Sequence, residues 1–102
     1  MKQLSASHKK YLKGLAHHLK PVAFLGQKGM TDAFIDSFNT ALDQHELVKI
    51  KFVDFKEKSQ KKEITDDIIE KVGCQLVGMT GHVTILYRQQ KDSKKRKIVL
   101  PK

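Results

Sequence analysis

Residues 21–42, PVAFLGQKGMTDAFIDSFNTAL, contain the strand–loop–helix step on which the fold depends. The apolar run at 21–26 is short and begins with proline and ends with glycine, which predicts a buried strand. Thr31 is a residue type that caps the N-termini of helices, and apolar residues recur at helical spacing after it. A strand followed by a helix predicts a right-handed crossover to a parallel strand of the same sheet.

Outward from this step, hydrophobic periodicity predicts further helices and strands. Pro21 ends the first helix, because proline cannot continue one, and Gly73 suits the position after the last helix. Residues 56–63 contain no apolar side chain and indicate a loop. The predicted elements are, in chain order, a helix at 5–19, a strand at 21–26, a helix at 31–45, a strand at 47–55, a helix at 64–72 and strands at 74–79 and 83–88.

This order predicts an α/β (α+β two-layer) domain with the sequence α-β-α-β-α-β-β and one four-stranded mixed sheet. The strand–helix–strand steps imply parallel pairing, and the final hairpin adds an antiparallel strand. With 102 residues the chain has the length of one domain. We expect that domain at 1–90, followed by a basic tail at 91–102 whose first half is loose.

Positive charge is strong and unevenly distributed along the chain. There are 20 Lys and Arg against 11 Asp and Glu, a formal net charge of +9. Residues 1–29 contain six lysines and no acidic residue, whereas residues 30–46 contain four acidic residues and no Lys or Arg. Basic blocks separated by acidic segments favour a polyanion as the partner.

The sequence lacks the patterns of an enzyme, a metal site or a membrane span. His17 and His18 are adjacent, so on a helix they point about 100° apart and cannot hold one metal ion. Cys74 is the single cysteine, which we expect to be a small buried residue rather than a nucleophile. No apolar run approaches the roughly 20 residues that cross a bilayer. We therefore expect a cytoplasmic monomer that is not an enzyme, with no cofactor, metal or membrane partner.

The loop GQKG at 26–29 is the motif with the most chemical content. Glycine lets another backbone approach closely, and the free N–H groups at a helix start attract anions. A G-x-x-G loop clamps the nucleic-acid backbone in KH domains, but it can also be a plain strand-to-helix turn. Lys28 within the loop and the lysine-rich first helix favour RNA over the plain turn.

Two longer stretches resemble the CRM domain family, in its single-domain bacterial YhbY-like form. They are AHHLKPVAFLGQKGMTDAFIDSFNTALDQHELVKIKF at 16–52 and LVGMTGHVTILYR at 76–88, within a similarity that covers about residues 4–90. The resemblance implies an RNA-binding protein with a fold similar to the C-terminal domain of translation initiation factor three. Bacterial members are associated with the precursor of the large ribosomal subunit, and plant relatives take part in intron splicing. The family often has lysine directly after the first glycine, where this chain has Gln27.

The candidate RNA-binding residues lie in the loop, on one arc of the first helix, on the basic face of the strand at 47–55 and after the last strand. They are Gly26, Gln27, Lys28, Gly29, Lys9, Lys10, Lys13, His17, Lys20, Lys49, Lys51 and Arg88. The competing interpretation is that these lysines form a solvated face that protects the sheet from aggregation. Five aromatic residues are assigned to the core instead of to base stacking, namely Phe24, Phe34, Phe38, Phe52 and Tyr87.

The alternative function is a protein–protein interaction module on the ribosome or on an assembly factor. Its contact surface would be the acidic second helix, which carries Asp32, Asp36 and Asp43.

Overall fold

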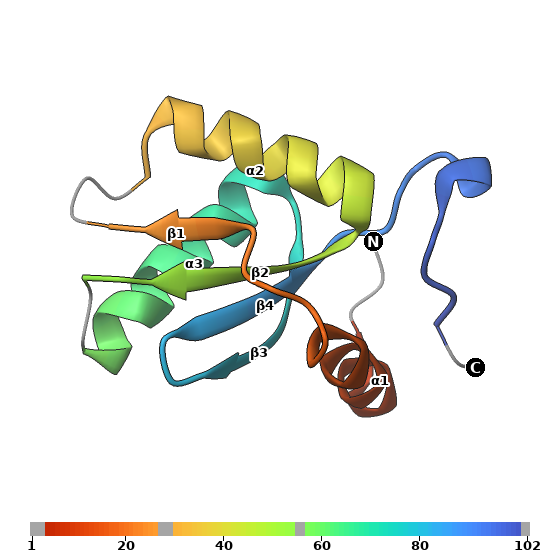
Figure 1. Cartoon of the computed structure of the whole chain (residues 1–102), viewed down its shortest axis with the longest axis horizontal. Coiled ribbons are helices and arrows are strands. Elements are labelled where there is room, and N and C mark those ends of the chain that lie inside the picture. The colour runs from red at the N-terminus through yellow and green to blue at the C-terminus, as the bar shows by residue number, and fades with distance from the viewer. Residues whose placement is uncertain (1–3, 27–29, 55–56, 101–102) are drawn as a thin grey trace.

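The computed structural model describes residues 4–26, 30–54 and 57–100 of the chain, and Figure 1 shows their arrangement. The predicted order of helices and strands is confirmed. The elements are α1 (Ala6–Ala16), β1 (Ala23–Leu25), α2 (Asp32–His45), β2 (Leu47–Phe52), α3 (Lys58–Val72), β3 (Gln75–Thr80), β4 (Val83–Tyr87) and a short 3₁₀ helix, η1 (Ser93–Lys95).

The sheet has four strands in the order β1-β2-β4-β3. β1 pairs with β2 in parallel, and β4 pairs antiparallel with both β2 and β3, so the predicted mixed sheet is confirmed. The register aligns residues in rows across the strands: Phe24 lies beside Lys51, and Lys51 lies beside Val83. Because side chains alternate between the two faces along a strand, the members of such a row share one face of the sheet.

Helices α2 and α3 cover one face of the sheet, and α1 lies against the opposite face (Figure 1). The larger core cluster joins the first face to α2 and α3, and each fully buried side chain in it stabilises the fold by about 1.5–3 kcal/mol. Its buried members include Leu25, Phe38, Leu42, Val48, Ile50, Phe52, Ile68 and Leu86. The smaller cluster lies beneath α1 and contains Leu12, Ala16, Leu47, Val77 and Tyr87.

Local signals set most of the helix ends. The Thr31 side chain accepts a hydrogen bond from Phe34 N at 3.1 Å, as expected of an N-cap. Gly73 follows α3 with φ of +67°, the left-handed conformation that glycine adopts most easily. The predicted loop at 56–63 is wrong in its second part, because α3 already begins at Lys58. Lys61 explains the difference: it is buried, and its Nζ donates to Gly81 O at 2.7 Å, which fixes this helical turn on the β3–β4 turn.

The C-terminal tail is docked on the domain as far as it is described. Glu46 is 1% exposed, and its Oε1 accepts hydrogen bonds from Lys97 N at 2.6 Å and from Ile98 N at 3.0 Å. Its Oε2 accepts a third bond from Gln90 N at 2.9 Å. Ile98 and Leu100 then pack against the cluster beneath α1. These contacts anchor the second half of the tail, from Lys97 onward, whereas the expectation of a loose segment concerned only its first half.

In the described parts of the chain, no helix has both the length and the apolar character needed to cross a membrane.

Candidate nucleic-acid interface

Helix α1 covers only one end of its face of the sheet. Its buried side chains pack on the row that contains Leu47 and Tyr87. The next two rows of the same face stay open to solvent or are only half-buried. We call this surface the open sheet face; its residues are Val22, Phe24, Lys49, Lys51, Gly78, Thr80, Val83 and Ile85.

Lys13 reaches from α1 over the open sheet face. A Cβ added to Gly78 would lie 2.5 Å from Lys13 Cε, so the aliphatic stem of this lysine runs directly against the backbone of β3. Glycine at this position leaves the room that the stem occupies. The absence of a side chain on β3 therefore lets a basic group from α1 lie above the sheet.

Strand β2 adds two further ammonium groups to the same surface. Lys49 is half-buried, and its Nζ donates to Leu19 O at 3.0 Å, which holds the side chain towards the end of α1. Two of its three N–H donors stay available, since an ammonium group has three. Lys51 is exposed and lies next to Phe24 in the register of the sheet. Within the described ranges, neither lysine forms an ion pair with a carboxylate.

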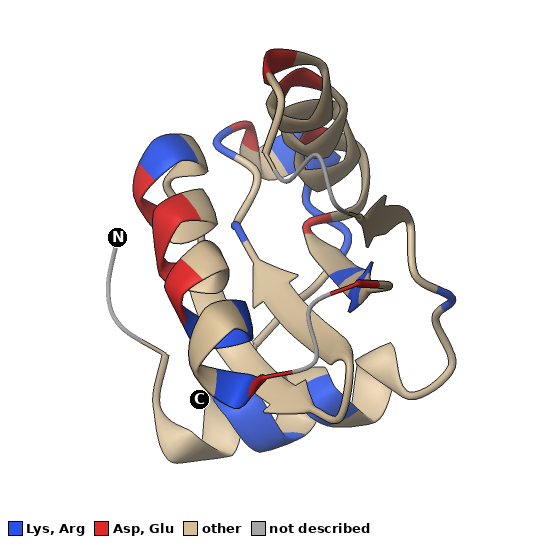
Figure 2. Ribbon diagram, turned by 90° about the vertical axis from the view of Figure 1, so that its left-hand side faces the viewer, with Lys and Arg blue, Asp and Glu red and all other residues tan. Residues whose placement is uncertain are grey.

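Helix α1 continues the basic surface beyond the sheet. Its sequence contains no acidic residue, and four more of the predicted residues on it or just after it are exposed, namely Lys9, Lys10, His17 and Lys20. The acidic residues gather instead on α2 and α3, the helices of the opposite face, as the red segments of Figure 2 show. The two faces of the sheet therefore differ in charge.

The predicted loop begins at the end of β1, beside the open sheet face. Gly26 is half-buried, and a Cβ added to it would lie 3.2 Å from Asp54 Oδ2, so this end of β1 runs close to Asp54, two residues after β2. Gln27, Lys28 and Gly29 lie outside the described residues. At the start of α2 the Thr31 hydroxyl already accepts the Phe34 N–H, and Asp32 adds a negative charge in the first turn. The helix start alone is therefore a weaker anion site than the sequence suggested.

Phe24 departs from its prediction as a core residue, because its side chain is 60% exposed. Its neighbours Ala23 and Leu25 point to the covered face, where both contact the larger cluster. β1 is an edge strand, and α1 packs mainly on β2 and β3 instead. Every residue of β1 is apolar, so the sequence does not reveal which of its side chains face the core and which face solvent.

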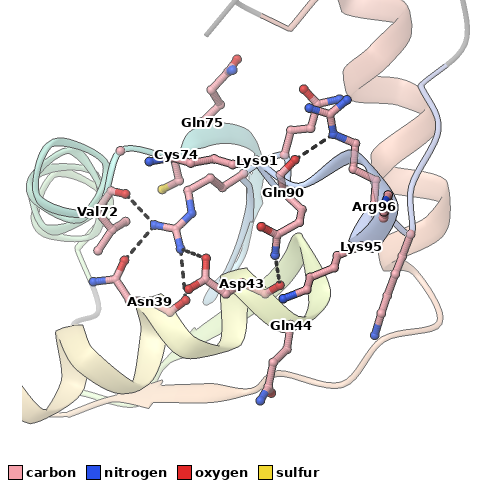
Figure 3. A pocket seen from close by; sticks show the side chains of 15 residues that line it. Asn39, Asp43, Gln44, Val72, Cys74, Gln75, Gln90, Lys91, Lys95 and Arg96 are labelled. Carbon is pink, nitrogen blue, oxygen red and sulfur yellow. Dashed lines mark hydrogen bonds and ion pairs between the residues drawn. The ribbon is translucent and has the colours of Figure 1, made fainter.

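Arg88 lies apart from the other predicted residues, because it bonds to α2 and to the end of α3; its partners Asn39, Asp43 and Val72 are labelled in Figure 3. Its Nη1 donates to Asn39 Oδ1 and to Val72 O, both at 2.8 Å. Its Nη2 donates to Asn39 O at 3.1 Å and to Asp43 Oδ1 at 2.9 Å. With four bonds inside the protein and 17% side-chain exposure, this guanidinium joins α2 to the end of α3.

A hollow of about 1660 Å³ extends from Arg88 to the first half of the tail. Figure 3 shows its polar lining, in which Gln90 Nε2 donates to Asp43 O and Arg96 Nε donates to Gln90 O, both at 2.7 Å. These bonds fix the tail in place beside α2. The hollow is separate from the open sheet face, since no residue of that face lines it.

Cys74 lines the same hollow as a buried thiol. Burial raises the pKa of the Cys74 thiol from its ordinary value to about 11, and the nearby positive charge of Arg88 opposes this rise only in part. A thiol with this pKa is protonated at neutral pH and is a poor nucleophile. Among the described residues, no group of three or more His, Cys, Asp and Glu side chains comes close enough to hold a metal ion.

We expect the native Cys74 thiol to react slowly with a thiol reagent at pH 8 and rapidly once the protein is unfolded in denaturant. The unfolded thiol ionises near pH 9 and the folded thiol near pH 11, so this group lowers the free energy of unfolding as pH rises between these values. Denaturant titrations of the parent and of Cys74→Ala across this range check the sign. Equal pH dependence in the two proteins would contradict the assignment.

Comparison with known proteins adds a consistent set of relatives. Residues 4–88 match the family model of the CRS1 / YhbY (CRM) domain. A Haemophilus influenzae protein named "RNA-binding protein" is 39% identical over 94 residues, which cover 92% of this chain and 94% of that one. A Bacillus subtilis protein named "Probable RNA-binding protein YqeI" is 30% identical over 91 residues, 89% of this chain and 94% of that one. A Staphylococcus aureus protein, described with its solution structure as a hypothetical, candidate RNA-binding protein, has a TM-score of 0.81 and 28% identity over 97% of this chain and 100% of that one.

Proposed function

Because the chain belongs to the CRS1 / YhbY (CRM) domain family, we propose that it binds RNA through the open sheet face, α1 and the loop at 26–29. One observation carries this proposal: Lys13, Lys49 and Lys51 meet on one open surface, although they come from two different elements. None of them is neutralised by a carboxylate within the described ranges. The names of the relatives, which describe them as RNA-binding, support the same function.

Phosphate contacts would dominate this mode of binding. The three lysines of the open surface and the exposed residues of α1 neutralise the RNA backbone, and Lys28 adds a charge at the loop. Backbone contacts fix position and orientation without reading sequence, so the shape of the RNA decides where the protein binds. Arg88 is left out of the proposed interface, since its guanidinium is used inside the protein.

We propose ribosomal RNA of the large-subunit precursor as the natural target, bound in the cytoplasm by a monomer without catalytic activity. The support is the resemblance to the single-domain bacterial members, which are associated with that particle. Crosslinking the protein to RNA in cells and mapping the crosslinked nucleotides tests the target directly. Crosslinks spread over messenger RNA instead of ribosomal RNA would contradict it.

A protein-binding module is the rival function, and a pull-down repeated after nuclease treatment separates the two. If the ribosomal proteins that co-purify with the protein are lost after nuclease treatment, the result supports RNA binding. Retention of a protein partner after complete digestion of the RNA would favour the rival.

We expect the affinity for RNA to fall steeply with salt concentration. With about five of the seven lysines of the proposed interface in contact with phosphates at once, at roughly 0.7–0.9 released counterions each, the slope in a plot of log affinity against log salt is about −4. Lys51→Gln and Lys28→Ala should each reduce the magnitude of this slope by about one unit. Fluorescence anisotropy with a labelled RNA hairpin at several salt concentrations provides the measurement.

The matched control is Lys71→Gln, which changes an exposed lysine in the last turn of α3 on the opposite face. It should leave the slope unchanged. A slope near zero for the parent protein would exclude phosphate binding of this kind. An equal effect of Lys71→Gln and Lys51→Gln would show that only net charge matters.

A further inference from the structure

Phe24 is the aromatic side chain of the open sheet face. Its ring is 60% exposed, whereas the other described phenylalanines are buried or half-buried, namely Phe34, Phe38 and Phe52. Ordinary folding does not account for the exposure, since a buried phenylalanine stabilises a protein and an exposed one on an edge strand invites aggregation. More than half of Phe24 is therefore available for contact with a partner.

The surroundings of Phe24 combine apolar and basic groups. Val22 precedes it on the same face of the chain and is 49% exposed, and Val53, which follows β2, is 54% exposed. Val53 N donates to Leu25 O at 3.0 Å, so the end of β2 stays paired with β1 beside the ring. Lys51 lies on the adjacent strand, at the usual strand spacing of about 4.8 Å. A flat apolar group therefore fits on the ring while an anionic group attached to it reaches an ammonium.

We propose that Phe24 is a stacking platform for one unpaired base of the RNA, with Lys51 bound to the phosphate beside that base. This inference rests on the proposed function and specifies the kind of RNA element that is recognised. A nucleotide carries both required features, a planar apolar base and an attached phosphate. Base stacking on an aromatic side chain tolerates any base, so it adds affinity without adding sequence preference.

The base must be unpaired, since both of its faces are covered by neighbouring pairs inside a duplex. Bases in loops and bulges can be turned out to meet a protein ring. One ring offers room for one base, and the other described side chains of the open sheet face are aliphatic, polar or basic. The target element is therefore a structured RNA in which one base protrudes beside a backbone held by lysines.

The test compares Phe24→Leu with the parent protein on two RNAs, a hairpin with a single-base bulge and the same hairpin with the bulge deleted, each with its loop replaced by a flexible linker that carries no bases. Leucine keeps an apolar side chain on the strand and removes the flat ring. Affinity for the bulged hairpin should fall about tenfold, within the range known for loss of one stacked base. Affinity for the fully paired hairpin, the salt slope and the melting temperature should not change.

A second variant reports the stacking directly. The chain contains no tryptophan, so Phe24→Trp introduces one indole at the platform. Its fluorescence should be quenched by the bulged hairpin and not by the paired one. Ser37→Trp is the matched control, because Ser37 is exposed on α2, which covers the opposite face of the sheet, and its fluorescence should respond to neither RNA.

The outcomes separate the two proposals. If the parent protein binds neither hairpin, the proposed function is wrong. If it binds both and Phe24→Leu binds both equally well, RNA binding stands and the stacking platform is overturned. The platform is also overturned if Phe24→Leu weakens the binding of both hairpins alike. A third contrary outcome is that Phe24→Leu leaves RNA binding intact and instead reduces the recovery of a protein partner that resists nuclease treatment.

Discussion

Replacing Arg88 by lysine is expected to lower the free energy of unfolding by about 2–3 kcal/mol without changing the affinity of the folded protein for RNA. The guanidinium donates to two main-chain carbonyls, Val72 O and Asn39 O, and to the side chains of Asn39 and Asp43. A lysine ammonium is a point charge and cannot span these acceptors as the planar guanidinium does. Asp43 is 67% exposed, so the ion pair contributes little and the carbonyl bonds contribute most.

Denaturant unfolding measures the loss, and Arg96→Lys is the matched control. Arg96 is exposed and makes one described side-chain bond, from Nε to Gln90 O, so its replacement should change the free energy of unfolding by less than about 0.5 kcal/mol. Equal losses in the two variants would show that the Arg88 bonds do not hold α2 to α3. A salt slope reduced by one unit in Arg88→Lys would return this arginine to the RNA interface that the sequence predicted.

Replacing Glu46 by glutamine should destabilise the protein by about 2–3 kcal/mol and release the tail. The carboxylate accepts three main-chain N–H bonds, from Gln90, Lys97 and Ile98, at a site that is 1% exposed. An amide replaces one acceptor oxygen by an NH₂ group, which cannot accept any of these bonds. Unfolding in denaturant gives the stability, and limited proteolysis within residues 91–100 reports the release.

The backbone at Glu46 allows a sharper comparison. Its φ is +62°, the one positive value among the described non-glycine residues, so the conformation costs about 1 kcal/mol or more. Glu46→Gly and Glu46→Ala both remove the carboxylate, but only glycine relieves the backbone. The alanine variant should therefore be the less stable of the two, with equal protease sensitivity in the tail. A tail as resistant as that of the parent in both variants would show that the carboxylate does not hold it.

The parts of the fold that could be predicted from the sequence depend on neighbouring residues. The cap at Thr31 and the glycine after α3 are local choices, and the structure confirms both. The alternation in β2 correctly assigned Val48, Ile50 and Phe52 to the core. Lys61 shows the limit of this reasoning, because its partner Gly81 is 20 residues away and no local pattern indicates it.

The candidate site was predicted less completely, because much of it depends on contacts between residues that are far apart in the sequence. The lysines of α1 and β2 followed from helical and strand periodicity. The exposure of Phe24 depends on how far α1 extends over the sheet, which is decided by tertiary packing. The internal use of Arg88 depends on Asn39, 49 residues away in the sequence. A charged residue after a strand looks the same in sequence whether it faces RNA or a buried carbonyl.

The packing of α1 has a consequence for protein synthesis. Leu12 and Ala16 contact Val77 and Tyr87, and residues of the tail complete the same cluster. During synthesis, α1 therefore finds only the Leu47 end of β2 to pack on until β3 and β4 have been made. A nascent chain can form the β1–α2–β2 unit while α1 is still incompletely docked, although domains tend to fold from the N-terminus as they emerge. Lys13 can take its place above β3 only after Gly78 has been added, so the basic surface is completed only once β3 has been made.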